Sequence, residues 1–123
     1  MRSSLLLLVL WSGAVLGHSW TPTYPPLQRS FMEGIVKAEM VLFNKREDVE
    51  YFEIEVTDKD FNSLPFASSQ RIYKVKYLER RTIKVFLKED LLHRTVYICS
   101  KSRFLKQNVS KNMVSSRICS KIR

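Results

Sequence analysis

Cys99 and Cys119 are the residues of this 123-residue chain whose type and spacing point to the most definite chemistry. They are the only cysteines, and an even number in an exported chain is typical of a disulfide framework. Structural zinc needs four ligands, so two cysteines alone do not favour a metal site. We therefore predict a Cys99–Cys119 disulfide, which would close a loop of about 20 residues and add roughly 3 kcal/mol of stability in the chain-entropy model.

The last part of the chain is strongly basic, and no acidic residue occurs from Thr95 onward. Single-stranded nucleic acid would need several stacking aromatics, and Phe104 is the only aromatic among these cations, so nucleic acid is not an expected partner. The segment predicts docking onto an acidic partner protein or an anionic envelope surface, and a solvated loop is the alternative. The residues of this predicted anionic-partner site are Lys101, Arg103, Lys106, Lys111, Arg117, Lys121 and Arg123.

Other residues that could catalyse or bind a metal lack the partners that such chemistry needs. His93 has no Ser or Cys motif beside it, whereas nucleophilic catalysis needs a nucleophile, a base and a group that orients the base. Glu53 and Glu55 share one strand face and could in principle act as paired acids, but a solvated strand face opposite lysines is far more common. The DKD run at residues 58–60 lacks the glycine and closing glutamate of a calcium loop. We expect no enzyme, no metal and no cofactor.

The NVS sequence at Asn108 matches the N-glycosylation sequon. Three-residue motifs also arise by chance, and a bacterial or phage origin would make the sequon irrelevant. Glycosylation of Asn108 therefore stays open.

The first nineteen residues have the layout of a secretory signal peptide. A basic start at Arg2 is followed by an apolar stretch from Leu5 to Leu16 and by small residues that suit cleavage after Gly17 or Ser19. The apolar stretch is shorter than the roughly 20 residues that a transmembrane helix needs, so an uncleaved anchor is the less favoured reading. We predict a signal-peptide helix at residues 1–19 and a periplasmic or extracellular protein without a membrane span.

Residues 20–33 form a proline-rich lead-in, and residues 34–123 are predicted to be one domain. Trp20, Tyr24 and three prolines suggest an extended lead-in, which is either a flexible tail or a segment that lays its aromatics on the domain. The remainder is long enough for one hydrophobic core. The chain carries a formal net charge of +9, from 21 Lys and Arg against 12 Asp and Glu, which favours anionic surroundings.

Strict alternation of apolar and polar residues indicates β-strands in the predicted domain. Phe52, Ile54 and Val56 alternate with polar neighbours, and Ile83, Val85 and Leu87 do so later in the chain. Turn clusters separate about seven such segments, which is typical of a β-sandwich or barrel. The expected strands lie within residues 31–43, 49–57, 64–66, 71–77, 82–87, 95–100 and 117–122.

Tyr97 lies two residues before Cys99, late in the chain, as the tyrosine corner of an immunoglobulin-like sandwich does. An antibody-type disulfide would use an earlier strand, whereas Cys119 follows Cys99, so the disulfide is expected to link the last two strands. The predicted fold class is all-β: an immunoglobulin-like β-sandwich of about seven strands, preceded by a signal-peptide helix.

Residues 35–100 resemble the N-terminal immunoglobulin-like domain of periplasmic pilus-assembly chaperones. The matching pieces are MVLFNKREDVEYFEIEV, LPFASSQRIYKV, the turn LERR and TIKVFL, which follow that family's order of strands and turns. The LFNKR…PFA…ICSK pattern also resembles small exported proteins, including phage-borne ones. The resemblance implies a non-enzymatic protein-binding and assembly module that engages a partner through a sheet edge.

The final segment departs from the chaperone family. The family's last strand in this domain carries alternating large apolar residues that it donates to a pilin subunit, whereas this chain has VSSRICSKIR there. The family also grips a subunit carboxylate between two domains, and this chain has no room for a second one, so that role is not transferred to Arg29 or Lys121. We predict an exported protein-binding module with a sheet-edge or basic-hairpin interface. A structural component of a cell envelope or virion surface is the alternative.

Overall fold

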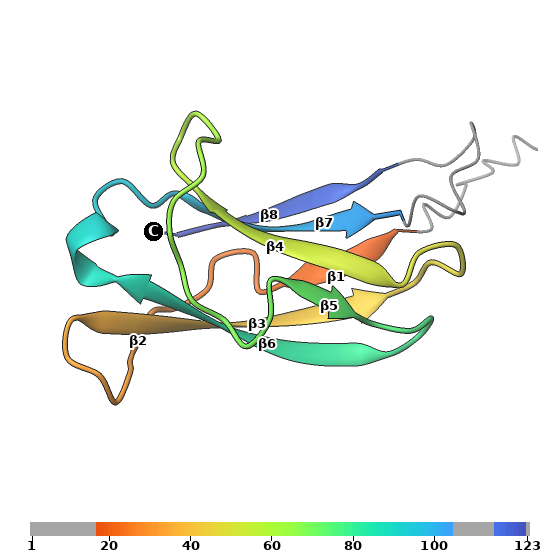
Figure 1. Ribbon diagram of the computed structural model, residues 1–123, viewed down its shortest axis with the longest axis horizontal. Helices are drawn as coiled ribbons and strands as arrows, with labels where there is room; N and C mark the ends of the chain where they lie inside the picture. Colours follow the sequence, from red (N-terminus) through yellow and green to blue (C-terminus); the bar gives the residue numbers. More distant parts are fainter. Residues whose placement is uncertain (1–16, 105–114, 123) are drawn as a thin grey trace, which may run out of the picture.

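The computed structural model describes residues 17–104 and 115–122. These residues form eight β-strands and one short 3₁₀ helix (Figure 1). In chain order the strands are β1 His18–Thr21, β2 Gln28–Arg29, β3 Ile35–Asn44, β4 Tyr51–Thr57, β5 Ile72–Lys74, β6 Arg80–Lys88, β7 Tyr97–Arg103 and β8 Arg117–Lys121, with the 3₁₀ helix η1 Glu89–Leu91 after β6.

The strands form two antiparallel four-stranded sheets that face each other (Figure 1). In sheet A, β6 pairs along nearly the whole of β3, so the short strands β1 and β2 share the other edge of β3. Sheet B has the order β5-β4-β7-β8, which makes β8 an edge strand. The predicted all-β class with a sandwich arrangement is confirmed.

The alternating residues of the longest strands build the core between the sheets. Val36, Ala38, Met40 and Leu42 point inward from β3, because successive side chains of a strand face opposite ways. The inward residues of β4 and β6 are the ones that alternation predicted, and all are buried. They are Phe52, Ile54 and Val56 on β4, and Ile83, Val85 and Leu87 on β6.

Six of the seven expected strands are present, one is missing, and two strands were not expected. The residues around Leu64 and Pro65 contribute only isolated bridges, at Ser63 and Ala67, because a proline has no N–H for a ladder. The two additional strands, β1 and β2, come from residues that the sequence placed outside the domain.

The predicted lead-in is part of sheet A, which corrects the domain boundary expected at residue 34. Trp20 pairs with Leu42 of β3, is 4% exposed, and donates a hydrogen bond from Nε1 to the Ile98 carbonyl of sheet B at 3.0 Å. Tyr24 is half-exposed by contrast. Of the two alternatives for this segment, packing against the domain holds for Trp20.

His18 and Ser19 also lie in β1, within the predicted signal segment of residues 1–19. The remainder of that segment, residues 1–16, lies outside the described residues, as does its predicted helix. Within residues 17–104 and 115–122, no helix has the length and apolar character to cross a membrane.

Replacing Trp20 by Ala is expected to lower the free energy of unfolding by about 3–5 kcal/mol, since a large core side chain and a buried hydrogen bond are lost. Tyr24→Ala is the matched control in the same segment and should cost less than about 1 kcal/mol. Urea unfolding of both variants measures the difference. Equal, small losses would show that the segment is a tail.

Candidate functional site

The outer edge of β8 presents backbone groups that no other strand covers in the described part of the chain. The Ser102 amide donates to the Ser116 carbonyl and the Ile122 amide to the Val96 carbonyl, so the even-numbered residues of this segment face β7. Arg117 and Cys119 therefore turn their N–H and C=O groups outward. One end of the edge is covered, because the Lys121 amide donates to the Thr23 carbonyl at 2.9 Å.

The disulfide joins β7 to this edge strand. Cys99 and Cys119 are register partners with Cα atoms 4.0 Å apart, which confirms the predicted pairing and the expected link between the last two strands. Because the neighbouring pairs exchange the backbone hydrogen bonds, the cysteines occupy a non-hydrogen-bonded pair, where Cα atoms approach most closely. The disulfide therefore fastens β8 to the sheet while its other edge remains open.

The predicted basic residues fall into three groups. Arg117 pairs with Glu55 at 2.6 Å and Arg103 with Glu53 at 3.3 Å, across the outer face of sheet B. Glu53 and Glu55 thus form a surface face opposite arginines, which agrees with the solvated-face alternative. Two residues, Lys101 and Lys121, have no ion pair within the described residues. The other three predicted residues, Lys106, Lys111 and Arg123, lie outside the described residues, as does Asn108.

Aromatic rings lie on the outer face of sheet B near the disulfide. Phe61 stacks on Tyr97 with ring centroids 4.8 Å apart and planes 4° apart. The Arg117 guanidinium lies over Phe61, 5.0 Å from the centroid of its ring. Cys99, on the same face, is fully buried. This cluster contributes an apolar, cationic surface directly beside the open edge of β8.

Tyr97 makes no hydrogen bond from its hydroxyl within the described residues, and its ring takes part in the stack with Phe61. A tyrosine corner needs a hydrogen bond from this hydroxyl to upstream backbone. The structure therefore does not show the predicted tyrosine corner.

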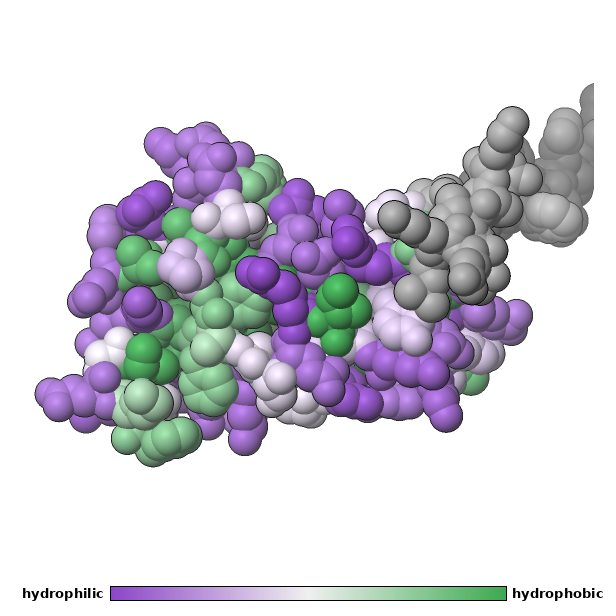
Figure 2. Space-filling model, in the orientation of Figure 1, coloured by the Kyte–Doolittle hydropathy of each residue, from purple (hydrophilic) through white to green (hydrophobic). Residues whose placement is uncertain are grey.

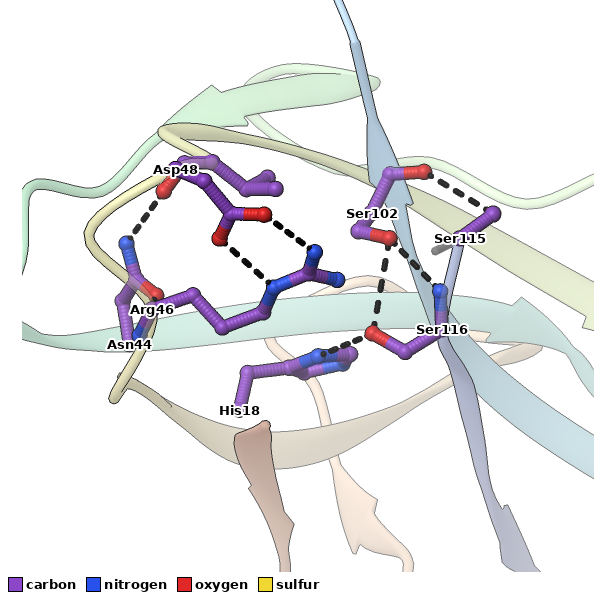
Figure 3. A network of polar contacts seen from close by, with 8 residues as sticks. His18, Asn44, Arg46, Asp48, Ser102, Ser115 and Ser116 are labelled. Carbon is purple, nitrogen blue, oxygen red and sulfur yellow. Dashed lines mark hydrogen bonds and ion pairs between the residues drawn. The ribbon is translucent and has the colours of Figure 1, made fainter. Parts of the chain in front are cut away.

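A polar network beneath β7 and β8 was not predicted from the sequence. His18 is hydrogen-bonded through Nε2 to Ser100 Oγ at 2.8 Å. Through Nδ1 it is hydrogen-bonded to Ser116 Oγ at 3.1 Å (Figure 3). The Ser116 amide donates to Ser102 Oγ at 2.7 Å. These bonds tie the first strand of sheet A to the last two strands of sheet B. A histidine directly after the small residues of a signal peptide was the only signal available in the sequence.

The His18–Ser100 pair has the atoms of a base and a nucleophile, but not their accessibility. Ser100 is fully buried, and both ring nitrogens of His18 are hydrogen-bonded to serines, so no carboxylate among the described residues orients the ring. The pKa of His18 is lowered to about 4, chiefly by burial; a hydrogen bond with the Ser100 backbone opposes this, and the nearby Arg46 guanidinium adds to the lowering. The neutral imidazole therefore serves the packing of the strands.

The end of the sandwich at which β8 begins carries most of the excess positive charge. The β3–β4 and β5–β6 connections lie at this basic end, where β7 ends and β8 begins, at the right of Figure 1. Its described acids are Glu47, Asp48, Glu50 and Glu79, together with Glu53 and Glu55, which pair with Arg103 and Arg117. Its described cations are Lys45, Arg46, Lys74, Lys76, Arg80, Arg81, Lys101, Arg103 and Arg117.

Several cations at the basic end remain available to an anionic partner. Arg46 pairs with Asp48 at 2.6 Å, which holds the pKa of that carboxyl below its usual value (Figure 3). Lys45 and Arg80 lie over the Phe43 ring, at 5.6 and 4.4 Å from its centroid, with no carboxylate partner in the described chain. The basic end therefore extends the predicted site beyond the C-terminal segment to cations that the sequence reasoning did not include.

The remaining candidates for chemistry serve local structure or the surface. Asp58 accepts backbone hydrogen bonds from Asp60 and Asn62, and the Asn62 amide is the main cause that lowers the pKa of Asp58. His93 is exposed. Within the described ranges, no group of three or more His, Cys, Asp or Glu residues could hold a metal ion.

No protein-family model matches the chain, and no curated protein matches its sequence.

Acidification is expected to destabilise the protein through His18. The folded pKa of about 4 lies below the unfolded value of 6.5, so between these values the unfolded state binds a proton that the folded state refuses. The free energy of unfolding should keep its full value above pH 6.5 and fall by about 3 kcal/mol as the pH drops to 4. Denaturant unfolding at several pH values measures this slope.

His18→Gln should flatten the slope between pH 6.5 and 4, while His93→Gln, at an exposed position, should leave it intact. Protonation of Asp48 also lowers the free energy of unfolding, but this happens at pH values below the ordinary pKa of 3.8, outside the range of the His18 effect. An unchanged slope in His18→Gln would contradict this account.

Proposed function

We propose that this chain is an exported, non-enzymatic protein-binding module of immunoglobulin-like β-sandwich fold, which binds an extended, acidic segment of a partner protein along β8. The observation that carries the proposal is the open edge at Arg117 and Cys119 on a basic strand. Unpaired N–H and C=O groups of an edge strand are a template for strand addition. The resemblance to pilus chaperones supports the same mode of binding.

The charge of the edge favours an acidic partner over a second copy of the same strand. Lys121 lies on β8, and Lys101 lies on β7 beside Arg117; neither lysine has a carboxylate partner within the described residues, whereas Arg117 is paired with Glu55. Two such strands brought together would repel each other, which is how natural edge strands avoid self-pairing. A partner strand with carboxylates would gain favourable charge pairs and a faster association that weakens with salt.

A binding role agrees with the burial of the Ser100 hydroxyl and with the proposed exported location. The hydroxyl of Ser100 and its His18 neighbour are buried, so their use is structural. A disulfide and an N-terminal apolar segment are compatible with a periplasmic or extracellular location. The departure from the chaperones is that β8 is short, polar and held by the disulfide, so it receives a strand and does not donate large side chains.

A photo-crosslinking residue at Lys121 is expected to capture one discrete partner, whereas the same residue at Lys59 captures none. Lys121 lies on β8, and Lys59 is an exposed control in the turn after β4. Arg117→Pro should abolish capture, because it removes an outward N–H without removing a bond to β7. Arg117→Gln keeps this N–H and should lower affinity only modestly, by about tenfold or less.

Equal capture by Arg117→Pro and the unaltered protein would refute strand addition. The fate of the captured partner separates an assembly factor from a structural component. Transient association, with the chain absent from the finished assembly, agrees with the proposal. Stoichiometric presence in an envelope or particle would replace it by the structural role.

A further inference from the structure

A half-open apolar pocket lies on the outer face of sheet A, at the end of the molecule opposite the basic end. Its volume is about 330 Å³. Ile35 of β3 and Phe86 of β6 form the floor, the loop with Phe31 and Met32 forms one wall, and the segment with Phe66 forms the other. Figure 2 shows apolar side chains gathered on the half of the visible surface where the β2–β3 loop and the segment before β5 lie.

Phe31 stands at the rim of the pocket almost entirely in water. Its side chain is 92% exposed and that of Met32 is 57% exposed, although both line the pocket. The loop that holds them is ordered by Ser30, whose hydroxyl donates to the carbonyls of Met32 and Ile35, and by Gly34 at a φ of 77°. A small ligand inside the pocket would leave Phe31 exposed, so the surface fits a partner that covers both the hole and the ring.

Acidic residues outnumber basic ones at the tip beside this pocket, and basic residues lie on its other side. Glu33, Glu89 and Asp90 lie at the tip together with Arg29 and Lys88, and the Glu89 amide donates to the Gly34 carbonyl there. The pocket comes next, and beyond it Lys84 on the outer face of β6 and Arg71, whose guanidinium lies 5.8 Å from the centroid of the Phe66 ring. Within the described residues, Glu33, Glu89, Lys84 and Arg71 have no carboxylate or cationic partner in an ion pair.

We propose that a second copy of this chain covers the pocket in a twofold dimer, with Phe31 of each copy inserted into the pocket of the other. A twofold interface needs a self-complementary patch, in which a residue contacts a partner position and the reverse contact is made as well. The projecting Phe31 ring beside the pocket gives this patch a self-complementary shape. The acid–pocket–base order supplies the charge, since an antiparallel copy brings Glu33 and Glu89 over Lys84 and Arg71.

The distribution of net charge permits association at this end and opposes it at the other. Copies that meet through the pocket hold their basic ends at the far sides of the dimer, beyond the range at which exposed charges interact at physiological salt. The β8 edge also stays open, so the dimer is independent of the proposed partner binding and would present two binding edges. Failure of either proposal leaves the other standing, because Phe31 and Arg117 belong to opposite ends of different sheets.

Sedimentation velocity of the purified, disulfide-bonded protein over a concentration series tests the dimer. We expect a reversible monomer–dimer equilibrium, and Phe31→Ser should raise the dissociation constant at least about a hundredfold, because the ring is lost twice per dimer. Leu78→Asn is the matched control: it removes another exposed apolar side chain, at the basic end, and should leave the equilibrium unchanged.

Charge reversal tests the orientation of the copies. Glu33→Lys with Glu89→Lys should weaken the dimer, and adding Lys84→Glu with Arg71→Glu should restore it, a rescue that a nonspecific apolar contact would not give. A protein that remains monomeric at every concentration overturns the proposal and leaves the pocket to a different protein. A dimer insensitive to Phe31→Ser overturns it as well.

Discussion

The architecture depends on the hydrogen bonds by which β1 of sheet A fastens the edge of sheet B. Trp20 donates to the Ile98 carbonyl, His18 bonds Ser100, and the Ser120 hydroxyl donates to the Pro22 carbonyl at 2.7 Å. The Trp20, His18, Ser100 and Ser120 side chains are buried, so leaving one of their polar groups without its hydrogen bond would cost about 1–3 kcal/mol. Through them an N-terminal strand of four residues positions the two C-terminal strands, and it leaves only part of β8 uncovered.

The two ends of the sandwich have acquired different surfaces as a consequence. Antiparallel pairing brings the β3–β4 and β5–β6 connections to the end of the sandwich where β7 ends and β8 begins. Four cations at this end have no carboxylate partner within the described residues: Lys45, Lys76, Arg80 and Lys101. The opposite end has balanced charge and the apolar pocket with Phe31. An acidic strand suits the first surface and a second copy of the chain suits the other, so one small domain can join two kinds of contact without competition.

The alternation of residues was enough to predict the sandwich and its core, because burial of Phe52 or Ile83 depends on a period of two that local sequence carries. The N-terminal strand was missed because β1 has four residues beside prolines and a signal-like segment, and only its pairing with β3 makes it a strand. The sequence showed where the cations lie along the chain, but it could not show which carboxylates pair with them. Glu55 neutralises Arg117 across 62 residues, which only the register of β4, β7 and β8 determines.

Amide hydrogen exchange along β8 tests the central claim, a strand fastened on one side and open on the other. Ile118, Ser120 and Ile122 face β7, and the Lys121 amide donates to Thr23, so these four amides should exchange slowly. The Arg117 and Cys119 amides should exchange faster by orders of magnitude, and the proposed acidic partner strand should slow them. Equal protection of all six amides in the isolated protein would contradict an open edge.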